Sequence, residues 1–215
     1  MKEITKISDI VGENSFLQSE KIEFFEHLLI NTNRTGVDKV IDFLRKTDFY
    51  YAPASASHSG NYRGGLLDHS LIVYLIAKSY NNALISISDD FRDKIDMVSL
   101  TLCSLLHDIC STCLYKEETK WKKGETNQWE SYIGYGINDT VPWGHGAKSV
   151  IMLQQLGLDL VSAEICAILY HMGFWETDAK DTRFSQMNAI KYFPIVTLIQ
   201  TANFESSVIF EKEKV

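Results

Sequence analysis

The sequence has few of the residues that interrupt helices. Its 215 residues include three prolines, Pro53, Pro142 and Pro194, and 12 glycines. The blocks between them favour helix, so we predict a mainly α-helical protein. With a hydrophobic share of 45% and a charged share of 23%, the composition excludes a disordered chain, a collagen-like repeat and a heptad rod. A chain of this length buries about 70% of its unfolded surface, which predicts one domain over 1–215.

The chain also lacks a long apolar segment. No stretch of ~18 uncharged apolar residues occurs, and the first residues, MKEITKISDIVGENSF, contain no apolar region followed by a small-residue cleavage site. We therefore expect a cytoplasmic protein without a membrane partner.

Positive charge is in deficit. The chain has 21 Lys and Arg against 28 Asp and Glu, which gives a formal net charge of −7. This charge opposes docking onto long duplex nucleic acid or anionic lipid. A small anionic ligand in a local positive site is still compatible with it.

Cysteine is scarce and irregularly spaced. The four residues Cys103, Cys110, Cys113 and Cys166 do not predict a disulfide framework in a chain of this size. Cys110 and Cys113 form a single CxxC pair, for which a role as small core or loop residues is favoured over zinc binding or redox chemistry.

Apolar residues recur at helical intervals along most of the chain. They predict helices at 15–30, 36–45, 66–80, 94–106, 145–156, 161–171 and 194–206. The segment 50–65 is built of small residues, Pro and Gly, and predicts an irregular loop. Residues 113–143 predict a long irregular lid or a β-hairpin insertion, with its turn around Gly124 to Asn127.

Aromatic residues and lysines alternate between Tyr115 and Trp143. Such a mixture can stack a base and hold phosphate. The alternative for Trp121 and Trp129 is a small satellite core under a long loop. We expect Trp143, two residues before His145, to line the functional site.

Four of the six histidines lie at predicted helix ends. His69 and His145 lie at helix starts, and His107 and His171 lie at helix ends, with Asp108 directly after His107. Helix ends can converge on one point, and imidazole with carboxylate suits Zn²⁺, Mn²⁺ or Fe²⁺. The alternative is that each is a hydrogen-bonded core or surface histidine. The set together favours a metal site.

These positions resemble a known family, the HD-domain metal-dependent phosphohydrolases. The segments that carry the resemblance are GGLLDHS, SLLHDIC, WGHGAKS and LYHMG. The chain is most similar to small stand-alone bacterial or phage HD proteins and to the HD domain of a bacterial 3′-to-5′ exoribonuclease, through PASASHSGNYRGGLLDHS. The resemblance implies an all-α HD-domain bundle with its core at 50–206, N-terminal helices at 1–49 and a C-terminal tail at 207–215.

The resemblance also implies roles for individual residues. His69, His107 and Asp108 would hold a first divalent transition metal ion, and Asp108 would bridge to a second. His145 and His171 would hold the second ion or contact phosphate. Asp108, His145 and His171 would be catalytic. The ions, one or two in number, would be Mn, Fe, Zn or Ni.

Two positions depart from the family pattern. Asn203 stands in TAN, where relatives usually have TAD, so it is expected either as a neutral metal ligand or as an amide beside the ligands. Ser111 stands where the family often has a lysine. Substrate binding would then pass to other residues, for which the expected candidates are Arg63, Lys148, Trp143 and His58. The alternative for each cation is a solvated surface charge.

The resemblance therefore implies a metal-dependent phosphohydrolase or phosphodiesterase, and we expect it to act on a nucleotide, cyclic nucleotide or short oligonucleotide. The alternative is a non-catalytic nucleotide-binding or sequestering protein with a partly degenerate metal site. A helical interaction module with satisfied core histidines is a third interpretation. The expected partner is a small phosphorylated ligand, and the oligomeric state is open, a homodimer included.

Overall fold

A computed structural model describes residues 2–124, 127–141, 143–176 and 180–210. Most of these residues are helical, and the model confirms the predicted predominance of helix. The α-helices are α1 (Gln18–Ile30), α2 (Val37–Lys46), α3 (Gly65–Ile87), α4 (Met97–Leu106), α5 (His145–Gln155), α6 (Ser162–Leu169), α7 (Lys180–Tyr192) and α8 (Pro194–Glu205).

Short helical turns connect several of these helices. They are the 3₁₀ turns η1 (Ile7–Asp9), η2 (Asp89–Phe91), η3 (Ile109–Ser111) and η4 (Gly173–Glu176), and the π-helical turn η5 (Ser206–Phe210). Residues 207–210 of the predicted tail therefore belong to a helical turn that continues α8. Residues 211–215 of that tail lie outside the described residues.

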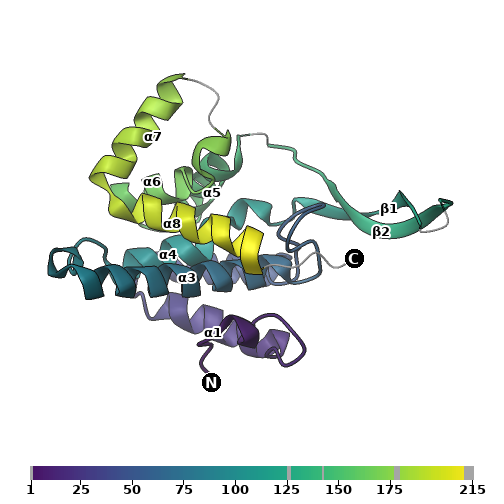
Figure 1. The fold of residues 1–215 in the computed structure, drawn as a ribbon, viewed down its shortest axis with the longest axis horizontal. Helices are drawn as coiled ribbons and strands as arrows, with labels where there is room; N and C mark the ends of the chain where they lie inside the picture. Colours follow the sequence, from purple (N-terminus) through teal and green to yellow (C-terminus); the bar gives the residue numbers. More distant parts are fainter. Residues whose placement is uncertain (1, 125–126, 142, 177–179, 211–215) are drawn as a thin grey trace.

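The long helix α3 lies at the centre of the bundle. It packs against α1 on one side and against α4 and α8 on the other (Figure 1). Its apolar residues face every direction, so that Leu66, Leu67, Leu71, Ile72 and Val73 are all fully buried. α3 continues to Ile87 rather than ending at the predicted Tyr80. A helix surrounded by other helices in this way holds His69, close to its start, deep inside the molecule.

The loop before α3 packs tightly against the start of the helix. A side chain at Gly65 would place its Cβ 2.1 Å from the carbonyl oxygen of Gly60, so the approach requires glycine. Within the loop, the backbone N–H of Ala54 donates to that same carbonyl at 2.9 Å. The loop is thereby held beside the first turn of α3.

A buried ion pair fixes the position of α6. Glu164 is fully buried and accepts hydrogen bonds from both terminal nitrogens of Arg34, at 2.8 and 2.7 Å, and from the hydroxyl of Ser99 at 2.7 Å. These bonds join α6 to α4 and to the connection between α1 and α2. The segment that follows α6 carries His171, so this network helps to place a candidate ligand.

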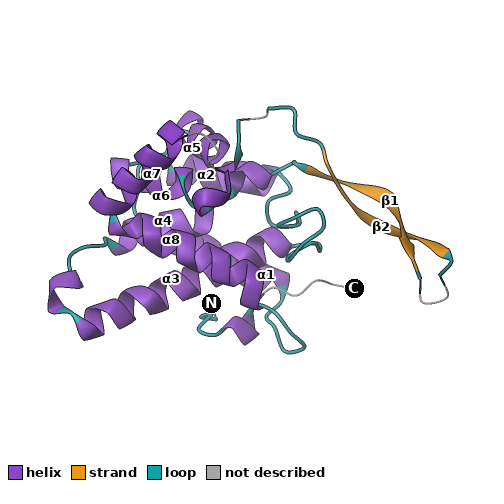
Figure 2. Ribbon diagram, turned by 45° about the horizontal axis from the view of Figure 1, so that its top comes forward, coloured by secondary structure: helices purple, strands orange, loops and turns teal. Residues whose placement is uncertain are grey.

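The predicted hairpin is present as two antiparallel strands, β1 (Tyr115–Lys123) and β2 (Trp129–Ile137). They pair from Tyr115 with Ile137 to Lys123 with Trp129, and turn residues 125–126 lie outside the described residues. The hairpin projects from the helical body (Figure 2). Trp121 and Trp129 are 62% and 63% exposed, so the satellite-core interpretation of these two residues is wrong.

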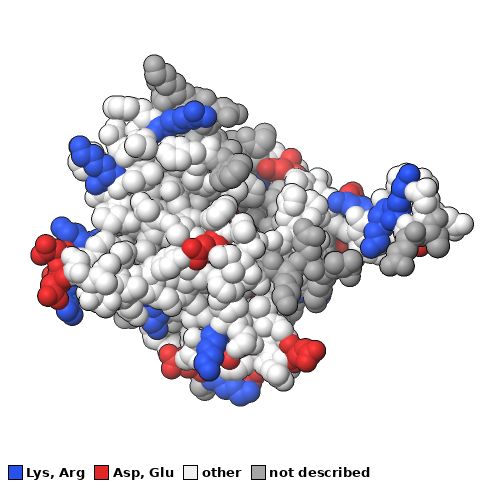
Figure 3. All heavy atoms as spheres, viewed as in Figure 1, with Lys and Arg blue, Asp and Glu red and all other residues white. Residues whose placement is uncertain are grey.

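Charges of both signs lie on the face shown in Figure 3. The hairpin carries lysines that include Lys120, Lys122 and Lys123 together with the glutamates Glu117, Glu118 and Glu130, and charges of both signs are also scattered over the helical body. None of the helices among the described residues combines the length and apolar character needed to cross a bilayer.

Candidate metal centre

Four helix ends bring the candidate ligands together. His69 lies in the first turns of α3, and His107 caps the C-terminus of α4 with Asp108 directly after it. His145 is the first residue of α5, and His171 follows α6. The expected convergence of the histidines is therefore present in the structure.

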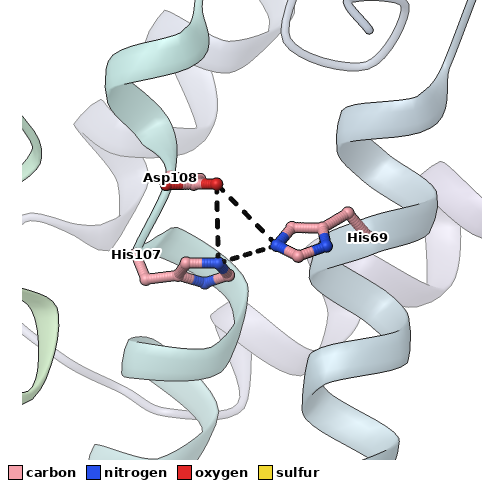
Figure 4. Close-up of side chains that lie close together, drawn as sticks. All are labelled: His69, His107 and Asp108. Atoms are coloured by element: carbon pink, nitrogen blue, oxygen red, sulfur yellow. Dashed lines mark hydrogen bonds and ion pairs between the residues drawn. The ribbon is translucent and has the colours of Figure 1, made fainter. Parts of the chain in front are cut away.

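The first group of donor atoms consists of His69, His107 and Asp108 (Figure 4). The Nε2 atoms of the two histidines lie 3.0 Å apart, and each lies 3.7 Å from Asp108 Oδ2. All three residues are buried. At these distances the three potential ligand atoms surround one small space.

The other carboxylate oxygen of Asp108 faces a different set of donors. Oδ1 lies 3.0 Å from His171 Nε2 and 3.8 Å from His145 Nδ1. The sulfur of Cys110 lies 3.3 Å from the same His145 nitrogen. The two oxygens of Asp108 are thus divided between two groups of donors, which is an arrangement suited to a carboxylate that bridges two ions.

Backbone carbonyls set the tautomers of two imidazoles. His107 Nδ1 lies 3.0 Å from the carbonyl of Ser104, and His171 Nδ1 lies 2.7 Å from that of Ile168. A carbonyl can only accept, so Nδ1 carries the hydrogen in both rings, and this tautomer leaves the lone pair of Nε2 on the side of Asp108, where an ion would bind. A hydrogen bond of this kind on the far nitrogen is the usual support of a metal-binding histidine.

The hydroxyl of Ser206 supports His69 in a similar way. Its Oγ lies 3.2 Å from His69 Nδ1. A hydroxyl can donate or accept, so this contact suits either tautomer of His69. The Nε2 contact between His69 and His107 can therefore be a hydrogen bond in the metal-free protein, and both Nε2 atoms can offer lone pairs when an ion binds.

Two buried polar atoms in the second group have no hydrogen-bond partner among the residues that the structure describes. These are Asp108 Oδ1 and His171 Nε2, which face each other at 3.0 Å without hydrogen-bonding geometry. Leaving such atoms unpaired in a protein interior costs about 1–3 kcal/mol each. A divalent cation would satisfy both, so this donor set of imidazole nitrogens and carboxylate oxygens fits a transition metal ion.

The protonation of these groups departs from ordinary behaviour. Burial lowers the pKa of His107 to about 3, so its ring is neutral near pH 7. Burial by itself would raise the pKa of Asp108, but the imidazoles of His107 and His171 and the contact with His145 hold it well below its usual value. Contact with Asp108, and next with Cys110, raises the pKa of His145 to about 11.

A cavity of about 790 Å³ opens above the ligands. His69, Asp108, His145 and His171 lie on its floor and walls, and His107 lies beneath it, fully buried. The other lining residues come from the loop before α3, the base of the hairpin, η4 and α8 with its continuation: Ala54, Ser55, Ala56, Ser57, His58, Ser59, Tyr115, Ile137, Met172, Gly173, Phe174, Gln200, Thr201, Asn203, Phe204 and Ser207.

Two of the other expected site residues line this cavity. His58 is exposed on the loop before α3. Asn203 is buried, and its side-chain nitrogen donates to the carbonyl of His171 at 3.4 Å and contacts the sulfur of Met172 at 3.8 Å. Asn203 therefore supports the segment that carries His171, in addition to facing the cavity.

Three expected substrate-binding residues lie elsewhere. Arg63 is exposed and stacks on the ring of Tyr51, 4.7 Å from its centre. Lys148 forms an ion pair with Asp139 at 2.7 Å. Trp143 is 51% exposed and lines a separate cavity of about 270 Å³ beside the main one. The sequence does not show the partners that hold these side chains away from the main cavity.

Sequence reasoning missed three residues at the site. The first is Cys110, whose spacing from Asp108 was visible but whose closeness to His145 depends on the η3 turn. Ser206 contacts His69 although the two residues are 137 positions apart, so no local sequence pattern predicts this contact. Tyr115 lines the cavity, and burial with the charge of Asp108 raises its pKa to about 12. Cys113, the other half of the CxxC pair, is exposed and does not join Cys110 at the site.

A scan of the chain against family models gave no match, and searches of curated proteins and of solved structures gave none either. The functional argument rests on the side chains themselves. They form a buried His and Asp cluster that can bind metal.

Proposed function

We propose that the protein is a metal-dependent phosphohydrolase or phosphodiesterase that acts on a nucleotide, a cyclic nucleotide or a short oligonucleotide. The observation that supports this most strongly is the division of the Asp108 carboxylate. One oxygen faces His69 and His107, and the other faces His145 and His171, at the floor of a cavity large enough for a nucleotide.

The residues of the chain have separable roles in this proposal. His107 and His171 offer fixed lone pairs, and Asp108 supplies negative charge between the two groups. Divalent ions held by these residues would supply an activated water and would neutralise charge that develops on phosphoryl oxygens. His145 has a raised pKa of about 11, so it gives up a proton when it becomes a ligand.

The walls of the cavity favour a substrate of low charge. Among the described lining residues there is no lysine or arginine, whereas Ser55, Ser57 and Thr201 offer hydroxyl groups. Hydroxyls can bind the oxygens of a phosphodiester, which carries one negative charge, better than they can neutralise a triphosphate. Phe174 and Phe204 lie on the same walls, and such rings can stack a base.

A binding protein without turnover is the second candidate. It is favoured by Ser111 and Asn203, which stand where the resembling family often has a lysine and an aspartate. Ser111 is fully buried and its hydroxyl is neutral, so it does not replace a phosphate-binding cation.

Turnover separates the two candidates. Metal-loaded protein is incubated with nucleoside monophosphates, cyclic dinucleotides and short oligonucleotides, and products are separated by chromatography. We expect metal-dependent product formation that Asp108→Asn abolishes and that Cys113→Ser, at an exposed cysteine away from the cavity, leaves intact. Tight retention of one ligand without product, at full metal occupancy, would favour the binding protein.

A further inference from the structure

We propose that Cys110 is a thiolate ligand of the second metal ion and holds it together with Asp108 and His145. The inference deepens the metal site on which the proposed function rests, because it predicts the chemical class of ion at the second position. It concerns binding of the ion and does not require hydrolysis.

Three donor atoms from two parts of the chain meet at this position. Asp108 carries one, Cys110 lies in the η3 turn that follows it, and His145 begins α5. A carboxylate oxygen, the cysteine sulfur and a histidine nitrogen lie within 4.8 Å of one another. The sulfur is 3.3 Å and the carboxylate Oδ1 is 3.8 Å from His145 Nδ1.

These separations match a tetrahedral metal site. Bonds of about 2.0–2.3 Å from Zn²⁺ to nitrogen, oxygen and sulfur place neighbouring ligand atoms roughly 3.3–3.8 Å apart. Cys110 is 1% exposed, so its sulfur needs no large movement from solvent to reach such an ion.

An independent observation points to the same place. Within the described part of the chain, Asp108 Oδ1 and His171 Nε2 are buried with no hydrogen-bond partner, and both residues line the cavity together with His145. His171 Nε2 lies 3.0 Å from Oδ1 and is therefore a candidate for the fourth ligand. A cation at this position would pair every one of these atoms.

Two of the other three cysteines, Cys103 and Cys113, are placed away from this position. Cys103 is buried, and its sulfur lies 3.8 Å from the carbonyl of Glu164. Cys113 is exposed, has a positive φ of 56° and donates its backbone N–H to Asp48 at 2.7 Å. Both offer matched substitutions that remove a thiol without touching the cluster.

A thiolate ligand has a chemical consequence. As the sulfur–metal bond forms, the thiol proton passes to solvent and no electron is transferred. Thiolate is a soft ligand, which favours Zn²⁺, Fe²⁺ or Co²⁺ at the second position over Mg²⁺ or Mn²⁺. The first position has nitrogen and oxygen donors alone and so lacks the additional preference that a sulfur ligand gives.

Titration with Co²⁺ tests the assignment, because a cobalt–thiolate bond gives an intense near-ultraviolet charge-transfer band. We expect this band in the wild-type protein and in Cys113→Ser, and its loss in Cys110→Ser. The Cys110→Ser variant should still bind the first ion, and its affinity for the second should fall by more than about tenfold. Thermal melting of metal-free Cys110→Ser, which replaces one atom, checks that the fold is retained.

The outcomes are distinct from those that test hydrolysis. A band that survives in Cys110→Ser, or two bound ions without a band in the wild type, would overturn the assignment and leave the sulfur as a hydrogen-bond partner of His145. A Cys110-dependent band with no turnover of any phosphoester would support the assignment and contradict the proposed function. Failure to bind cobalt at all would overturn both.

Discussion

Asp108→Asn is expected to abolish metal-induced stabilisation of the protein. Asp108 contributes one oxygen to each group of donors, so a single substitution weakens both. Asparagine keeps the shape of the side chain but loses the charge and one of the two acceptor oxygens. Neither group then retains an anionic oxygen facing its imidazoles.

The size of the effect follows from mass action. One ion present at 100 times its Kd adds about 2.7 kcal/mol to the free energy of unfolding. For a chain of 215 residues, each kcal/mol raises Tm by about 2–4 °C, so one ion adds about 5–11 °C. Two ions that bind the wild-type protein should add about 11–22 °C.

Differential scanning fluorimetry with and without Zn²⁺ or Mn²⁺ measures these shifts. The expected shift in Asp108→Asn is less than about 2 °C. His69→Gln removes a donor from the first group alone and should keep roughly half of the wild-type shift. His27→Gln is the matched control, since His27 is an exposed histidine on α1 and contacts Asn31.

Two results would refute the reasoning. If Asp108→Asn kept more than half of the wild-type shift, the ion would bind somewhere other than around this carboxylate. If His27→Gln lost as much as Asp108→Asn, the stabilisation would come from adventitious binding to surface histidines.

Three further predictions concern the surroundings of the ligands. Ser206→Ala removes the hydroxyl beside His69 Nδ1 and should lower metal affinity about 10-fold or more, measured by competition with a chelating dye. The pKa of His107 is lowered to about 3 by burial, so the unfolded chain binds the proton first as pH falls below 6.5. Stability of the metal-free protein should therefore decrease from pH 6.5 towards pH 3, by up to about 1.4 kcal/mol per pH unit in urea titrations. Arg34→Ala leaves Glu164 buried without its cation and should lower the free energy of unfolding by about 3–5 kcal/mol, measured by the same method.

Each of these predictions has a control. An unchanged affinity in Ser206→Ala would show that its hydroxyl does not orient a ligand. His107→Gln should flatten the acid slope, whereas His145, whose pKa is raised to about 11, is protonated in both states below pH 6.5 and adds none. Arg45→Ala breaks an exposed ion pair with Glu26 and should cost only a small part of what Arg34→Ala costs, and equal losses would contradict the argument from burial.

Much of the candidate site could be predicted because its residues follow or begin strongly apolar helices. The run from Leu66 places His69 inside the bundle, and the apolar helix α4 ends at His107. The hairpin could be predicted from alternating segments on both sides of a turn that begins at Gly124. In each of these cases the signal is local.

The parts that could not be predicted depend on distant contacts or weak patterns. Helix α7 was not predicted, since its sequence KDTRFSQMNAIKY carries little apolar periodicity. Lys148 pairs with Asp139, and Arg63 stacks on Tyr51. Both contacts depend on how the folded chain arranges its surface, so a local sequence pattern does not predict them. Cys110 meets His145 only because the η3 turn and the start of α5 are packed together.

The contact between Ser206 and His69 has a consequence for how the protein acquires an ion during its synthesis. The two residues are 137 positions apart, and His145 and His171 also follow His69 by long intervals. During synthesis, His69 therefore leaves the ribosome long before Ser206, which contacts its ring. It also precedes His145 and His171, which complete the candidate centre. Full metal affinity therefore has to wait until η5 has packed against α3 and brought Ser206 to His69, which couples tight binding of an ion to the docking of this late segment.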